Sequence, residues 1–376
     1  MMMTRDVVLE KVERAMAEQQ LDALVAASPW NVKYCSGTSF FTQRTLPERL
    51  GLVVMTRGQE PVFIYCTIEE GHAKGESWLR EFRGYTEFAE QPIAVLAEVL
   101  RERGVARGRI GIEKRFLVTK NAEELRAALP EAAIVDADPL FDRMRAIKTP
   151  EEIAWLGQIA LWTDAAIYDA WSQAHTGESE REIGDRMIAG TRAHGATGVV
   201  HMVLSTGPNA HKAHGEPGDT RLEPVGVLRT DFGVLWGSYI SDLARTAFVH
   251  PVRPKQIDIY KALEEAHQTT IAAMVPGARA SDIYALCRDA CTQRGLRFTM
   301  PHVGHSIGLG VHEQPMLHPY DHTRLEVGMM LMLEPLVIAD DGLYAVEDLI
   351  EISEQGPRVR SRSHDWSEPL IIDAPR

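Results

Sequence analysis

The first 145 residues alternate between two kinds of hydrophobic spacing. Short apolar runs predict strands, at residues 21–26, 51–55 and 61–65. Apolar residues recurring at steps of three and four predict helices, at residues 92–102 and 122–128. This alternation predicts a small α/β domain over residues 1–145.

The second half of the chain opens with a strong signal for the start of a helix. Thr149 can cap the helix, Pro150 suits its first position, and Glu152 completes a capping box. The following apolar positions fall on one helical face and continue toward Gly177; they are Ile153, Leu156, Ala160, Thr163, Ile167 and Ala170. We therefore expect a long helix with one buried face, and a domain boundary that separates residues 1–145 from residues 146–376.

The remainder of the second domain mixes helical and strand-like patterns. Further helices are predicted at residues 179–193, 254–273 and 281–294. Strands are predicted at residues 199–204, 226–236, 244–249, 329–333 and 343–352. The larger domain is therefore predicted to be α+β.

Composition supports two domains in a soluble, globular chain. The chain has 376 residues, of which 45% are hydrophobic and 25% charged, and single cores rarely grow beyond about 250–300 residues. Its 40 Lys and Arg face 53 Asp and Glu, a net charge of −13 without a basic cluster, which argues against nucleic-acid binding. Four cysteines without a CxxC pair, no signal-peptide pattern and no long apolar run predict a cytoplasmic protein with no membrane association.

Histidines and acids concentrate in the second domain. Ten of the 14 histidines lie between His201 and His322. Asp242 follows Asp231 by eleven residues, with Gly233 and Gly237 between them, so two strands joined by a turn could bring both carboxylates together.

Further candidate groups follow toward the C-terminus. His305 and His312 flank a glycine-containing segment, while Glu334 and Glu347 interrupt runs that otherwise read as apolar strands. Buried carboxylates are rare unless they are paired or bind a metal ion. Four acids and one imidazole carry more negative charge than one divalent ion needs, which indicates two metal ions.

The motifs together resemble the methionine aminopeptidase, prolidase and creatinase superfamily. They are Asp231 with Asp242, GHSIGLGVHE at residues 304–313, LEP at residues 333–335 and VED at residues 346–348. The resemblance spans residues 145–355 and implies the pita-bread fold. It also implies that the first 145 residues form the accessory α/β domain of the prolidase and creatinase branch.

The resemblance implies a role for each site residue. The implied metal ligands are Asp231, Asp242, His305, Glu334 and Glu347, with Asp242 and Glu347 bridging two divalent ions. Manganese is the first choice, with cobalt, zinc and iron as alternatives. Glu334 would transfer the proton of the attacking water, and His214 and His312 would face the substrate.

The activity implied is that of an Xaa-Pro dipeptidase or aminopeptidase, which cleaves the amide bond before proline. A homodimer is also implied, with residues 40–49 as a loop that reaches the neighbouring subunit. Many proline-specific relatives carry arginine and glycine where this chain has Ala345 and Leu336. The alternative is therefore a small non-peptide substrate, as in relatives resembling ectoine hydrolase or dimethylsulfoniopropionate lyase.

Other histidines and an arginine near these motifs are expected to support the site rather than to bind metal or substrate. We interpret His201, His211 and His302 as groups that support the ligands or lie at the surface. Arg245 is expected to stabilise the carboxylate cluster through fixed hydrogen bonds.

Overall fold

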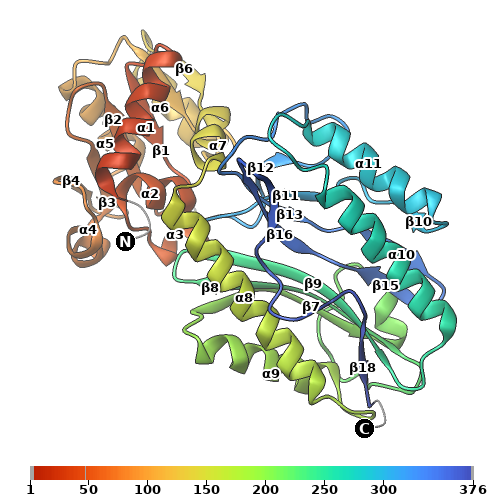
Figure 1. Ribbon diagram of the computed structural model, residues 1–376. Coiled ribbons are helices and arrows are strands. Elements are labelled where there is room, and N and C mark those ends of the chain that lie inside the picture. The colour runs from red at the N-terminus through yellow and green to blue at the C-terminus, as the bar shows by residue number, and fades with distance from the viewer. Residues whose placement is uncertain (1–3, 47, 374–376) are drawn as a thin grey trace. The chain divides into compact units, whose positions relative to one another are not determined.

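The computed structural model describes residues 4–46 and 48–373, and the chain divides into two compact units, Met1–Arg145 and Ala146–Arg376 (Figure 1). The helices of the first unit are α1 (Arg5–Glu18), α2 (Pro29–Ser36), α3 (Phe41–Thr45), the 3-10 helix η1 (Thr67–Glu69), α4 (Glu70–Glu76), α5 (Pro92–Glu102), α6 (Thr119–Ala128) and α7 (Asp138–Ala146). Its strands are β1 (Ala23–Ala26), β2 (Leu52–Thr56), β3 (Val62–Cys66), β4 (Glu81–Tyr85), β5 (Arg109–Ile112) and β6 (Ala133–Asp136).

These strands form one mixed six-stranded sheet in the order β4-β3-β2-β1-β5-β6. Strands β1, β2 and β3 pair antiparallel in turn, whereas the other neighbours pair parallel. The apolar side of α5, including Leu96 and Leu100, packs with Val25, Val54 and Ile110 of the sheet in one buried cluster. The predicted α/β character of this region is confirmed.

The second unit contains the helices α8 (Pro150–Ser172), α9 (Glu180–Ala193), the 3-10 helix η2 (Gly207–His211), α10 (Pro254–Ile271) and α11 (Ala280–Gln293). Its strands are β7 (Gly198–Thr206), β8 (Val227–Trp236), β9 (Tyr239–Val249), β10 (Arg297–Phe298), β11 (Gly304–Ser306), β12 (Glu313–Met316), β13 (Met330–Leu333), β14 (Leu336–Ala339), β15 (Gly342–Ala345), β16 (Asp348–Ser353), β17 (Gly356–Val359) and β18 (Leu370–Ile372). Helix α8 packs on α9 and β9, and α10 packs on α11 (Figure 1).

Helix α8 begins as the sequence predicts. The Thr149 side chain accepts a hydrogen bond from the backbone N–H of Glu152, and the Glu152 side chain accepts one from the backbone N–H of Thr149. This reciprocal pair satisfies two N–H groups that the first helical turn leaves open. The predicted apolar face is buried except for Ile153, which is half-buried, and the helix ends at Ser172, before Gly177.

The strands of the second unit form three sheets. A four-stranded sheet has the order β18-β9-β8-β7, a five-stranded sheet the order β12-β11-β13-β16-β17, and a three-stranded sheet the order β10-β14-β15. The prediction of one strand over residues 343–352 is wrong. The chain leaves the three-stranded sheet at Ala345 and enters the five-stranded sheet at Asp348, because the backbone N–H of Glu347 turns to donate to the carbonyl of Ala244, 3.0 Å away.

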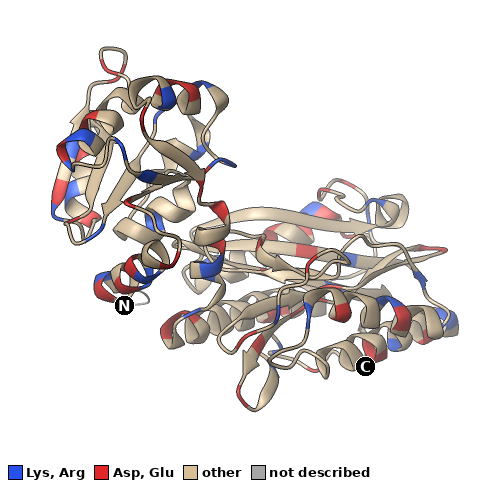
Figure 2. Cartoon of the chain, turned by 90° about the horizontal axis from the view of Figure 1, so that it is seen from above, with Lys and Arg blue, Asp and Glu red and all other residues tan. Residues whose placement is uncertain are grey.

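Positively charged residues, in blue, and negatively charged residues, in red, alternate along the helices and loops of the chain (Figure 2). This distribution agrees with the absence of a basic cluster in the sequence. Among the described residues, no helix combines the length and the hydrophobicity that a membrane span needs.

Candidate metal centre

Asp231 and Asp242 lie on the hairpin formed by β8 and β9. The register places Gly233 directly opposite Asp242 and Asp231 opposite Ala244. Asp231 and Gly233 are two residues apart and share one face of the strand, so the two aspartates are diagonal neighbours on that face. Gly237 in the connecting turn has a φ of 69°, a conformation that glycine adopts readily.

His201 on β7 extends this group across a third strand. It lies opposite Gly233 in the register, next to an irregularity of the ladder between Val199 and His201. Its Nε2 lies 2.8 Å from Oδ1 of Asp231 and 3.1 Å from Oδ1 of Asp242. Of the two interpretations of His201, these contacts with both carboxylates agree with a group that supports the ligands and disagree with one that only lies at the surface.

The remaining predicted ligands come from another sheet. His305 lies on β11, and Gly304 beside it faces Leu333 at the end of β13. Leu333 in turn faces Asp348 at the start of β16. Glu334 follows β13 and Glu347 precedes β16, so both glutamates sit where the chain passes between the five-stranded and the three-stranded sheet. They lie at strand breaks, where the sequence pattern had suggested strand interiors.

The two sheets bring these side chains into two overlapping groups. Ligand atoms of Asp242, His305 and Glu347 all lie within 4.8 Å of one another, and those of His201, Asp231 and Asp242 meet the same limit. Asp242 belongs to both groups. Glu334 lies beside them, with its Oε1 3.5 Å from Nε2 of His305.

His305 is held in the form that a metal ligand needs. Its Nδ1 lies 3.0 Å from the carbonyl oxygen of Ser306, and because a carbonyl only accepts, Nδ1 carries the proton and Nε2 keeps a free lone pair. Burial lowers the pKa of His305 to about 4, so the ring is neutral at neutral pH.

The negative charges of the buried acids are not balanced by enough positive charges or hydrogen-bond donors of the protein. Burial first, and then the charges of Asp242, Glu334 and Asp231, raise the pKa of Glu347. Burial, together with the charges of Asp231 and Glu334, raises the pKa of Asp242 to about 7 even though His201 acts in the opposite direction. Within the described part of the chain, Oε2 of Glu347 and Oε1 of Glu334 are buried without a hydrogen-bond donor. Carboxylate oxygens in this state, beside a neutral imidazole, fit divalent cations.

The other histidines lie at different distances from this cluster. The ring of His312 is 4.2 Å from the ring of His305, and Nδ1 of His302 is 3.3 Å from Oε1 of Glu334. His214 is exposed on the turn after η2, and no interaction recorded for the described residues joins it to the acids. The segment before His214 is held to β8, the strand that carries Asp231. The buried Arg229 on this strand donates to the carbonyls of Lys212 and Ala213.

Arg245 organises a buried network beside the centre. Its guanidinium donates to Asp164 at 2.9 Å, to Asp348 at 3.1 Å and to the carbonyl of Glu347. We had expected Arg245 to bond the carboxylates of the predicted ligands. Its carboxylate partners are instead Asp164 and Asp348. Arg362 completes the network with a 2.7 Å bond to Asp348. Asp164 is a buried residue inside α8, and the helical periodicity of the sequence did not single it out.

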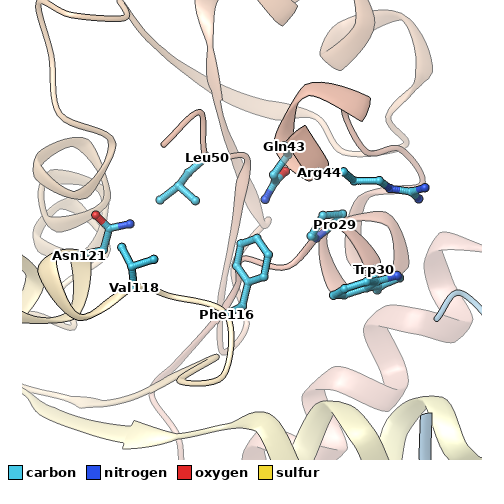
Figure 3. Close-up of a pocket in the computed structure, with 8 residues that line it drawn as sticks. All are labelled: Pro29, Trp30, Gln43, Arg44, Leu50, Phe116, Val118 and Asn121. Carbon is cyan, nitrogen blue, oxygen red and sulfur yellow. The ribbon is translucent and has the colours of Figure 1, made fainter. Parts of the chain in front are cut away.

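A pocket of about 400 Å³ lies elsewhere, in the N-terminal unit (Figure 3). Its walls carry mostly apolar groups, from Pro29, Trp30, Gln43, Arg44, Leu50, Phe116, Val118 and Asn121. None of these residues belongs to the predicted site. Part of the expected loop at residues 40–49 is the short helix α3, and residue 47 lies outside the described residues.

Fold and cluster together define a metal-dependent hydrolase with an α/β domain ahead of its α+β domain. Residues 156–356 match metallopeptidase family M24, and residues 9–147 match the creatinase/prolidase N-terminal domain. The first match covers more than half of the chain, so the protein belongs to metallopeptidase family M24. The predicted pita-bread fold, the predicted branch of the superfamily and the predicted hydrolase class are confirmed.

Similar proteins extend over nearly the whole chain. An Xaa-Pro dipeptidase of Pyrococcus furiosus is 29% identical over 355 residues, which cover 93% of this chain and 96% of the relative. The solved Xaa-Pro dipeptidase from Bacillus anthracis superposes with a TM-score of 0.85 at 26% identity and covers 97% of this chain and 100% of its own. The prolidase structure from Pyrococcus furiosus has a TM-score of 0.80 at 27% identity and covers 94% and 100%.

Proposed function

We propose that this protein is an Xaa-Pro dipeptidase that cleaves the amide bond before proline at a dinuclear metal centre. The observation that carries the proposal is that four predicted ligands, from two sheets, fall into two overlapping groups of potential metal ligands, with Glu334 3.5 Å from His305 beside them. The four are Asp231, Asp242, His305 and Glu347. Relatives named Xaa-Pro dipeptidase or prolidase that match both units in one alignment support the substrate class. They do not favour the small non-peptide substrate.

The proposed ligands, which would together hold two divalent ions, are Asp231, Asp242, His305, Glu334 and Glu347. Two bound divalent ions would lower the pKa of water and polarise the scissile carbonyl. Residues 146–376 would form the catalytic domain and residues 1–145 the accessory domain. Manganese as the resident metal, the homodimer and the cytoplasmic location remain predictions from the sequence.

Three side chains would carry out proton transfer, hydrogen bonding to the carbonyl oxygen and contact with the substrate. Glu334, half-buried next to His305, is placed to take the proton of the attacking water on its carboxylate and deliver it to the leaving nitrogen. His312, beside His305, would donate to the carbonyl oxygen as negative charge develops on it. His214 would contact the substrate from the turn that Arg229 anchors.

The test is hydrolysis of matched Xaa-Pro and Xaa-non-Pro dipeptides by metal-stripped protein reloaded with manganese, cobalt or zinc. We expect metal-dependent release of proline, with Glu334→Gln as the inactive control. No cleavage of any Xaa-Pro peptide by protein that carries two ions per chain would contradict the substrate assignment. Full activity of Glu334→Gln would contradict the role of Glu334.

A further inference from the structure

Within residues 4–46 and 48–373, His201 is the one imidazole outside the predicted ligand set that contacts two predicted ligand carboxylates. We propose that His201 is itself a metal ligand, which supplies a nitrogen donor to the ion held by Asp231 and Asp242. The inference rests on the proposed dinuclear centre and adds a sixth protein ligand to it.

The distances suit three donors on one ion. Metal–donor bonds of about 2.0–2.2 Å place two donors that meet at a right angle on the same ion, as in six-coordinate geometry, about 2.8–3.1 Å apart. Nε2 of His201 lies 2.8 Å from the Asp231 oxygen and 3.1 Å from the Asp242 oxygen, which agrees with that spacing. One nitrogen that faces two carboxylate oxygens at these distances fits a shared cation, and an imidazole that donates a hydrogen bond to the acids is the alternative that the experiment has to exclude.

The backbone makes room for this ring. His201 and Asp242 lie opposite Gly233 from its two sides in the sheet, one on β7 and the other on β9. A Cβ atom at position 233 would clash with the His201 ring, so only glycine allows the imidazole to lie over β8 and approach Asp242. The irregular pairing between Val199 and His201 also changes the direction in which the histidine points.

With His201 as a ligand, each of the two groups of potential ligands combines one imidazole with two carboxylates. Asp242, His305 and Glu347 form one group, and His201, Asp231 and Asp242 form the other. Each contains one imidazole, and Asp242 links them. The ion at Asp231 would therefore have a nitrogen ligand in place of an oxygen-only environment.

Donor chemistry gives this arrangement a consequence for metal choice. Oxygen ligands suit magnesium and manganese, whereas imidazole suits zinc and iron. His201 should therefore shift the Asp231 side of the centre from manganese toward zinc. A histidine that only donated a hydrogen bond to the acids would affect the binding of both metals alike.

The decisive experiment is a crystal structure of the zinc-reloaded full-length protein, with the ions located by anomalous scattering. We expect one ion about 2.0–2.2 Å from Nε2 of His201. Two bound ions that both lie beyond bonding distance, with His201 hydrogen-bonded to Asp231, would overturn this inference and leave the proposed function intact. Protein that binds no zinc and cleaves no Xaa-Pro peptide would overturn both.

Variants provide a second readout that does not depend on activity. His201→Phe should weaken zinc binding at one of the two sites more than it weakens manganese binding there, measured by metal titration and by metal content per chain. His302→Phe is the matched control, since His302 also contacts a predicted ligand but belongs to neither group. Equal weakening of zinc and manganese in His201→Phe, or equal zinc loss in both variants, would overturn the proposal. Gly233→Ala displaces the ring without removing it and should reproduce the effect of His201→Phe.

Discussion

Leu336 on β14 and Ala345 on β15 lie directly opposite each other in an antiparallel pair. Each stands two residues from a predicted glutamate ligand, Glu334 and Glu347, near the points where the chain changes sheets. The two departures from the pattern of proline-specific relatives are therefore cross-strand neighbours. A large apolar side chain faces a small one here, where those relatives would place glycine opposite arginine.

This pairing predicts that the two positions are not independent. Ala345→Arg alone should destabilise the protein by about 1–3 kcal/mol, because the added side chain has to be accommodated opposite Leu336. Leu336→Gly combined with Ala345→Arg should recover part of that loss, with a coupling energy of about 0.5–3 kcal/mol. Urea unfolding of the wild type, both single variants and the double variant measures this coupling, and strictly additive effects would show that the positions do not interact.

Removal of Arg245 should be among the most damaging single changes to stability. Arg245→Met leaves the buried Asp164 without its guanidinium partner and Asp348 with Arg362 as its remaining one, which should cost about 3–5 kcal/mol. The control is Arg83→Met, because the Arg83–Glu102 ion pair is exposed and should cost less than about 1 kcal/mol. Chemical denaturation of the two variants compares them, and similar losses would contradict the importance of the buried network.

Metal removal should lower the thermal stability of the wild type. Without cations, the acids of the centre repel one another, and ions that bind only the folded state add about 2.7 kcal/mol at a free concentration of 100 times Kd. Scanning calorimetry with a chelator and after reloading tests this. Glu347→Gln should be at least as stable as the wild type in chelator, because it removes one of the crowded charges, but should gain less from added metal. A wild-type melting temperature that chelation leaves unchanged would count against a metal centre here.

His312→Ala should reduce turnover and leave metal content nearly unchanged. The ring lies beside His305 but belongs to neither group of potential ligands, so its loss should affect the reacting carbonyl more than the ions. Steady-state kinetics together with metal analysis separates the two effects. Loss of metal in this variant would make His312 a ligand.

The sequence predicts those parts of the protein that local patterns control. The start of α8 follows from Thr149, Pro150 and Glu152, and the hairpin that joins Asp231 to Asp242 follows from two apolar runs around a glycine turn. Periodicity did not reveal the breaks at Glu334 and Glu347, because a change of sheet depends on pairing with distant strands.

The contact of His201 with two predicted ligands could not be predicted for a related reason. Its relation to Asp242 depends on the register of three strands and on the missing side chain of Gly233, and neither is a property of the sequence near His201. A glycine two residues after Asp231, in the interior of a strand, was the available sign that another group approaches closely there.

Because the predicted ligands come from two sheets, the two parts of the centre can form at different stages of folding. Asp231 and Asp242 are joined by one short hairpin, whereas His305 and the glutamates meet only after segments far apart in the chain have paired. Contacts between nearby residues form with a small loss of chain entropy, and long-range pairing is slower. The hairpin half of the centre can therefore exist early in folding, and the complete centre forms only when β11, β13 and β16 have assembled beside it.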